Sequence, residues 1–332
     1  MRPALVMLCL AFLSTGAQAR EADGRLGLLL LPNDARPALV LPGQSFVVVA
    51  REQAELALKS ISGTFDVRTR WIRLPSGLHE GVGRVPPGAP PGMYTLEGVS
   101  DGTKDRNFRS VFVYESFPET YRVAHLSNLR IGSETGRDTR IFQSTKAINE
   151  ADVAIVLVTG DLTNAGTPKQ YAQALDLLGD CLAPTLVSLG HAEQASGLAG
   201  DFLGPSTFAL RFGWDGYLGY YSATLDDLDM EGRAGDMYRM RRSIRSARWS
   251  VGFTNDYGPD VRLRDQLILF LDDPLDVVIT ARHARTHEVR FSIPWGDTRG
   301  FAMPTSDRGG VQIYDVGPGG VHLSAGPGHN ID

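Results

Sequence analysis

The chain divides into two stretches that differ in the spacing of their apolar residues. Up to about residue 114, apolar residues recur in short or alternating runs separated by turn residues, which is typical of β-strands with one buried face. Six runs are expected to be strands: 26–31, 45–50, 55–61, 69–74, 93–99 and 110–114. Strands at this spacing predict a β-sandwich of immunoglobulin-like shape in residues 20–118.

Beyond residue 118, strand and helix patterns alternate. Four runs are continuously apolar or nearly so, as expected of strands buried on both faces. They are residues 123–126, 153–159, 184–189 and 275–280. Residues 139–150 have an apolar face at helical spacing, and Thr167-Pro168 marks another helix start, because threonine caps a helix and proline fits its first turn. The pattern predicts a sheet flanked by helices in residues 119–332, with loops at the strand ends holding any site.

The first nineteen residues have the composition of a signal peptide. Arg2 precedes an apolar run at residues 4–13, and Ala17-Gln18-Ala19 is a small-x-small cleavage site. The run is about half the ~20 residues that a spanning helix needs, and no later stretch is long enough. We therefore expect export, to the periplasm or outside the cell, and no transmembrane segment.

Charge and cysteine content narrow the function classes. The net charge of −5 argues against a general nucleic-acid binder. After removal of the signal peptide Cys181 is the only cysteine, so no intramolecular disulfide is expected. Cys181 precedes an apolar run, which predicts a small core residue instead of a reactive thiol.

Gly160-Asp161 follows an apolar run and opens a longer string that ends at Pro168. This string and the order of its neighbouring segments resemble the Gly-Asp motif region of calcineurin-like metallophosphoesterases, over most of residues 120–325. The resemblance implies an α/β/β/α sandwich fold for the second domain. It also implies two metal ions that hold a hydroxide for attack on a phosphate ester.

Most metal-ligand positions of that family are altered in this chain. The positions that align with ligands are Asn128, Arg130, Asp161, His191, Asn255 and Arg282. Only Asp161 keeps an ordinary ligand, since an amide is a poor substitute for a bridging carboxylate and arginine cannot coordinate a cation. The resemblance therefore implies an inactive member of the family, without a metal cofactor.

Three interpretations of this altered site remain open. If Arg130 and Arg282 point inward, they bind an anion such as phosphate or an acidic glycan, or one of them forms a structural salt bridge with Asp161. In the alternative, an active phosphoesterase holds one divalent ion of Mn, Fe or Zn. Its ligands are Asp161, His191, Asn128 and Glu193.

The leading hypothesis is an exported protein that binds an anionic ligand or a protein partner without catalysis. The β-sandwich and an arginine cluster at residues 239–248 are candidate contact surfaces. A purely structural component of the cell envelope is a third class, which requires neither a pocket nor a metal.

Overall fold

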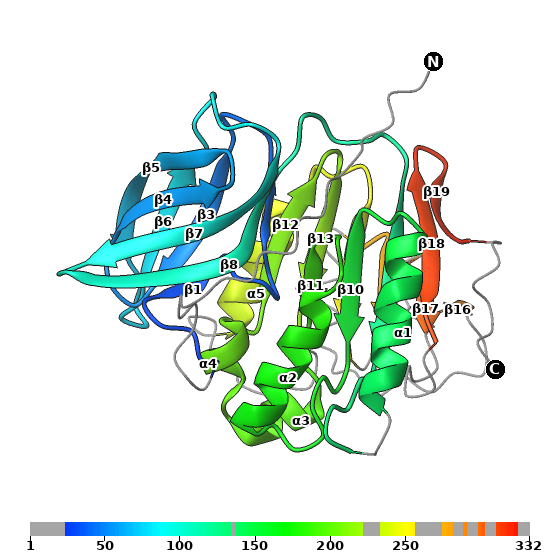
Figure 1. Cartoon of the computed structure of the whole chain (residues 1–332). Helices are drawn as coiled ribbons and strands as arrows, with labels where there is room; N and C mark the ends of the chain where they lie inside the picture. Colours follow the sequence, from blue (N-terminus) through cyan, green and yellow to red (C-terminus); the bar gives the residue numbers. More distant parts are fainter. Residues whose placement is uncertain are drawn as a thin grey trace.

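A computed structural model describes residues 24–133, 137–221, 233–255, 274–281, 288–290, 298–302 and 310–324. Its strands form three sheets, of eight, five and six strands. The eight-stranded sheet spans Leu29 to Val113 and is called the N-terminal unit below. The other two sheets span Tyr121 to Leu323 and, with the helices, are called the C-terminal unit (Figure 1). The predicted signal peptide, residues 1–19, lies outside the described residues.

The N-terminal unit is one continuous sheet that rolls over on itself. Its strands are β1 (Leu29–Leu31), β2 (Ala38–Val40), β3 (Ser45–Ala50), β4 (Glu55–Ser60), β5 (Gly63–Arg73), β6 (His79–Arg84), β7 (Gly92–Ser100) and β8 (Thr103–Val113). The first half of β5 pairs with β4 and its second half with β6. The prediction of an immunoglobulin-like sandwich is corrected here, because β5 joins by hydrogen bonds what would be two separate sheets in such a domain.

Alternating side chains explain how this sheet encloses a core. In β3, Phe46 and Val48 point inward and Val47 points outward. In β6, a Cβ atom added at Gly81 would lie 2.6–2.9 Å from the side chains of Thr69 and Trp71, so glycine makes room for the tryptophan ring. The inner side chains from both layers form one apolar cluster.

The C-terminal unit contains two mixed sheets. The five-stranded sheet has the order β11-β10-β9-β18-β19, with β9, β10 and β11 parallel. Its strands are β9 (Tyr121–Ser127), β10 (Ile155–Thr159), β11 (Thr185–Val187), β18 (Gln312–Gly317) and β19 (Gly320–Leu323). The six-stranded sheet has the order β12-β13-β14-β15-β17-β16. Its strands are β12 (Phe208–Phe212), β13 (Asp215–Gly219), β14 (Ser250–Thr254), β15 (Val277–Thr280), β16 (Glu288–Arg290) and β17 (Arg299–Ala302).

Five helices occur among the described residues. They are α1 (Arg137–Glu150), α2 (Pro168–Gly179), α3 (His191–Ser196), α4 (Ala199–Leu203) and α5 (Arg233–Ser243). The Thr167 hydroxyl accepts a hydrogen bond from Gln170 N, and Pro168 occupies the first turn, which confirms the predicted start of α2. Within the described part of the chain, no helix has the length and apolar character needed to cross a membrane.

Two apolar clusters show how the layers pack. One face of the five-stranded sheet packs on α1 and α2 through residues such as Val158, Ile148 and Leu175. The opposite face packs on the six-stranded sheet through residues such as Leu157 and Phe253. Figure 1 shows α1 and α2 side by side across the five-stranded sheet.

The predicted α/β/β/α fold of a metallophosphoesterase is wrong. The described residues form nineteen strands and five helices, two of them of only six and five residues. The strand content is high because further segments, such as β12 and β13, pair as antiparallel strands. The apolar runs of the sequence alone do not distinguish this strand-rich structure from the predicted α/β/β/α fold.

A segment of the N-terminal unit is built into the C-terminal unit. Ala35 O accepts a hydrogen bond of 2.9 Å from Val187 N, at the edge strand β11. Asn33 Nδ2 donates to Leu203 O at 3.2 Å, and Leu39 belongs to the apolar cluster between the two C-terminal sheets. The two units therefore share core and backbone pairing.

Candidate functional site

The residues predicted from the strand ends do meet in space. A Cβ atom at Gly160 would lie 2.3 Å from Asn128 Oδ1, 2.6 Å from Asn255 Oδ1 and 2.9 Å from the Ala281 Cβ. Gly160 also has a φ of +83°, so its tight position between these side chains requires glycine. Loops after β9, β10, β14 and β15 thus form one cluster, which we call the Asp161 cluster.

Asp161 is held by groups of the protein. Its Oδ1 accepts a hydrogen bond from Ala192 N at 3.2 Å, and its Oδ2 lies 3.5 Å from Arg130 Nε. Its amide donates to Asn128 Oδ1 at 3.3 Å, while Asn128 Nδ2 donates to Ala281 O at 3.2 Å. Each of these polar groups therefore has a partner inside the cluster. Arg130 is half-exposed and forms an ion pair with Asp161.

His191 and Glu193 hydrogen-bond to groups other than Asp161. The exposed His191 makes a 2.6 Å hydrogen bond between its Nδ1 and the Tyr221 hydroxyl. The buried Glu193 carboxylate accepts from Leu162 N, Thr163 N, the Thr163 hydroxyl and Gly190 N, at 2.7–3.1 Å. Glu193 thereby fixes the loop after β10 against the start of α3.

The electrostatics of Glu193 agree with a structural role. Burial raises the pKa of its carboxyl, and hydrogen bonds from Thr163 and Leu162 oppose that rise. Within the described residues, no three side chains of His, Cys, Asp or Glu come together as metal ligands would. Arg282, the second predicted anion-binding residue, lies outside the described residues.

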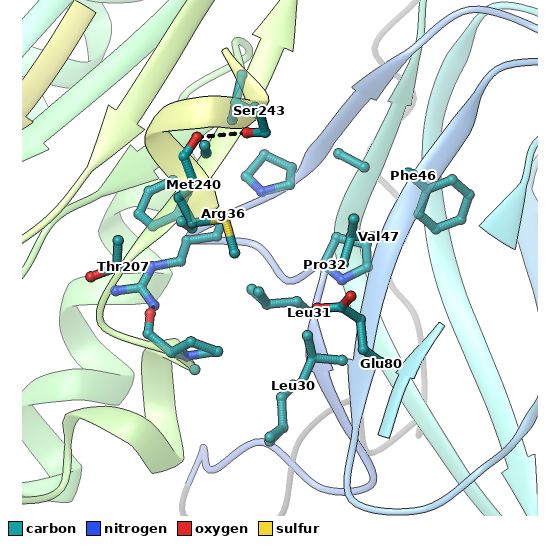
Figure 2. Close-up of a pocket in the computed structure, with 18 of the residues that line it drawn as sticks. Leu30, Leu31, Pro32, Arg36, Phe46, Val47, Glu80, Thr207, Met240 and Ser243 are labelled. Carbon is teal, nitrogen blue, oxygen red and sulfur yellow. Dashed lines mark hydrogen bonds between the residues drawn. The ribbon is translucent and has the colours of Figure 1, made fainter. Parts of the chain in front are cut away.

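A second candidate site is a cleft between the two units, with a volume of about 1050 Å³. Its first wall is the outer face of β3 and β6, where Val47 and Val82 are cross-strand partners and are both about half exposed. Its second wall includes Met240 and Ile244, in and just after α5. Pro32 and Arg36 also line the cleft, and Figure 2 draws Pro32 on the side of Val47 and Arg36 on the side of Met240 and Thr207. The lining is mainly apolar, as in most small-molecule sites.

Of the residues that the structure describes, five charged ones line this cleft: Arg36, Glu80, Glu193, Arg211 and Arg239. Arg239 donates to Glu80 at 2.7 Å, which joins α5 to β6 across the cleft. Arg36 is only 3% exposed, and burial lowers its pKa to about 9. The guanidinium is therefore still cationic at neutral pH, and it contacts two backbone carbonyls and the Phe208 ring.

Sequence reasoning placed the site at the strand ends and missed this cleft. Arg36 belongs to a Pro-rich turn, a type of segment that predicts only a connection between strands. Val47 and Val82 are apolar residues at outward-facing positions of β3 and β6, which is a sequence signal for an apolar binding surface. A single sequence does not show that these two strands pair, so the two valines could not be placed side by side.

Comparisons with known proteins assign no family. No family model and no curated protein matches the chain. Among solved structures, amylomaltase from Corynebacterium glutamicum is 14% identical over 39% of this chain, with a TM-score of 0.21. This chain spans only 21% of that enzyme.

Two further matches are similarly distant. A hypothetical protein from Thermus thermophilus is 15% identical, with a TM-score of 0.35 over 55% of this chain and 75% of its own. A putative alpha-galactosidase/melibiase from Bacteroides fragilis is 11% identical, with a TM-score of 0.27 over 79% of this chain and 59% of its own. Scores this low do not transfer a fold or an activity.

The resemblance to calcineurin-like metallophosphoesterases is therefore corrected. No family model matches the chain, and its described residues contain far more strand than helix. A glycine-aspartate pair after a buried strand is a short motif, and the geometry of a strand-end loop is enough to explain both residues. Gly160 allows the tight turn, and Asp161 pairs with Arg130.

Proposed function

We propose that this protein acts by binding, without catalysis, and that the cleft between the two units is its binding site. The observation that supports this most directly is the cleft itself: about 1050 Å³ of mainly apolar space with walls from both units. Clefts between domains are frequent sites for small ligands. The ligand is an anionic molecule or a segment of a protein partner.

The Asp161 cluster supports the same proposal by contrast. Its carboxylate, amides and backbone groups hydrogen-bond to one another, and both His191 and Glu193 have other partners. A hydrolytic centre needs ligands or a nucleophile that point at a shared vacant position. This cluster instead holds four loops together.

Export remains part of the proposal. It depends on the signal-peptide features of residues 1–19, and it places the binding site in the periplasm or outside the cell. Edman sequencing of the protein secreted from its native host tests export, since a mature chain that begins at Arg20 is expected.

Fluorescence of the neutral dye Nile red tests the cleft without any assumption about charge. We expect saturable binding that Val82→Asp weakens by about tenfold or more, since a charge replaces apolar contact in one wall. Val99→Asp is the matched control, because Val99 is an exposed strand valine that does not line the cleft. Equal loss in both variants, or no binding, would contradict the proposed site.

Activity and metal content test the absence of catalysis. Purified protein is incubated with p-nitrophenyl phosphate and its mono- and diester analogues, and its metal content is measured. We expect no turnover above that of Asp161→Ala. Turnover that disappears in Asp161→Ala, together with stoichiometric Mn, Fe or Zn, would refute a non-catalytic role.

A further inference from the structure

Arg36 is a cation at the inner side of the cleft with part of its guanidinium unused. Its Nε donates to Val187 O at 3.2 Å, its Nη1 donates to Pro205 O, and its guanidinium lies 4.7 Å from the centre of the Phe208 ring. Its Nη2 has no hydrogen-bond partner among the described residues, although the atom is buried. A buried donor without a partner costs about 1–3 kcal/mol, so an acceptor at Nη2 would be favourable.

No carboxylate of the described residues compensates this charge. Burial is the cause of the lowered pKa of Arg36, with no contribution from an acidic neighbour. The two acidic residues of the cleft are engaged elsewhere, Glu80 with Arg239 and Glu193 with the loop after β10. A negative group brought in by a ligand therefore meets an uncompensated positive charge.

A hydroxyl donor lies in the segment that Arg36 contacts. Arg36 touches Pro205 and Phe208, and Thr207 between them lines the same cleft while only 8% exposed. Figure 2 shows the Arg36 side chain on the same side of the cleft as Thr207. One guanidinium nitrogen with one hydroxyl nearby fits a carboxylate, whereas a doubly charged phosphate requires more donors.

The rest of the cleft fits a hydrocarbon chain. Val47 and Val82 expose about half of their surfaces on the first wall, and Met240 and Leu210 lie on the second. Exposed apolar side chains grouped in a cleft indicate an apolar ligand or partner. The space of about 1050 Å³ is at the upper end of the range for ligands of drug size.

We propose that the cleft binds an amphiphilic carboxylate, with its hydrocarbon body between the apolar walls and its carboxylate at Arg36 Nη2 and Thr207. This inference rests on the proposed binding function and names the class of its ligand. The side chain of Arg36 must turn slightly for Nη2 to meet the ligand, because the atom is buried.

Three probes with the same chain and different head groups test the inference in the unaltered protein. They are dodecanoate, dodecanol and dodecyltrimethylammonium, each titrated by displacement of Nile red below its micelle concentration. We expect dodecanoate to bind about tenfold more tightly than dodecanol, as a charge-assisted hydrogen bond predicts, and the ammonium probe to bind most weakly. Equal affinity for dodecanoate and dodecanol would overturn the inference and leave the proposed cleft intact.

Two arginine variants locate the charge that matters. Arg36→Gln is expected to remove the preference for dodecanoate over dodecanol while dodecanol binding persists. Arg211→Gln is the matched control, since Arg211 lines the cleft and donates to Ser246 at 2.7 Å. A preference that survives in Arg36→Gln but disappears in Arg211→Gln would refute the assignment.

Because Arg36 also bonds to Val187 and Pro205, Arg36→Gln is first checked for its thermal unfolding midpoint. If that variant does not fold, Thr207→Val serves in its place, with an expected reduction of the preference by about threefold to tenfold. An unchanged preference in Thr207→Val would then contradict the proposed position of the head group. If the unaltered protein does not bind Nile red at all, the underlying binding function is refuted instead.

Discussion

Glu97 offers the sharpest test of the electrostatics of the N-terminal unit. Its side chain on β7 is 8% exposed and its carboxylate lies 2.8–2.9 Å from Lys59 Nζ, Lys104 Nζ and Arg106 Nε. Burial alone would raise the pKa of Glu97, but hydrogen bonds from these three cations outweigh it and lower the pKa to about 2. Removing the charge therefore leaves three cations facing one another.

The size of the effect follows from that pKa. A drop from the ordinary value of 4.5 to about 2 corresponds to ~3 kcal/mol at about 1.36 kcal/mol per pKa unit. Lys59 and Lys104 are 36% and 46% exposed, so solvent screening reduces the contribution. We expect Glu97→Gln to lower the free energy of unfolding by about 1–2 kcal/mol at neutral pH.

Urea unfolding followed by circular dichroism measures this loss. The exposed Glu55→Gln on β4 is the control and should change little. Because the folded-state pKa lies below the unfolded one, the stabilisation is present above about pH 4.5 and disappears as the pH falls toward 2. A difference between wild type and Glu97→Gln that stays constant from neutral pH to about pH 3 would refute the reasoning.

The other predictions concern the C-terminal unit. Gly190→Ala places a Cβ 2.4 Å from Asp161 N and should lower the free energy of unfolding by about 2 kcal/mol. Gly200→Ala is the control, because its Cβ would have nothing within 4 Å; equal unfolding midpoints of the two variants would contradict this prediction. Asp215→Asn breaks a buried two-bond ion pair with Arg248 and should lower the unfolding free energy by about 3 kcal/mol in urea; a change below about 0.5 kcal/mol would show the pair to be dispensable. Burial raises the pKa of the Cys181 thiol to about 12, so a thiol reagent at mildly alkaline pH should label it only after unfolding, and rapid labelling of the folded protein would refute its burial.

Alternation and long apolar runs predicted most strands that have a buried face. The expected run at 45–50 coincides with β3, and residues 153–159 contain β10. Strand β6 was missed, because its His-Glu-Gly-Val-Gly-Arg sequence has only one apolar side chain. Its glycines make room for neighbouring rings, a property of the assembled sheet and not of the strand.

The arginine cluster shows a different limit of sequence patterns. If residues 239–248 formed one helix, their spacing would place Arg241, Arg245 and Arg248 on one solvated face. The helix α5 instead ends at Ser243, Arg241 is 3% exposed, and Arg248 pairs with Asp215. A long side chain buries its charge when a partner comes from a distant strand, and such partners are invisible to local periodicity.

The candidate site was predictable in part. Asn128, Asp161 and Asn255 do converge, because parallel strands bring the loops after them to one edge of the sheets. The hydrogen bonds among these residues were not predictable from their types, because the partners come from separate loops that meet only in the folded chain. The cleft depends on two units meeting, and no single segment encodes it.

The insertion of Ala35 against β11 has a practical consequence for dissecting this molecule. A protease cut between residues 114 and 120 would release two fragments, each missing part of its fold, and the second would expose the bare edge of a strand to other chains. Experiments on isolated fragments would therefore measure aggregation and not ligand binding. Genetic exchange of one unit for a homologous piece meets the same obstacle, so both units are best altered by single substitutions within the intact chain.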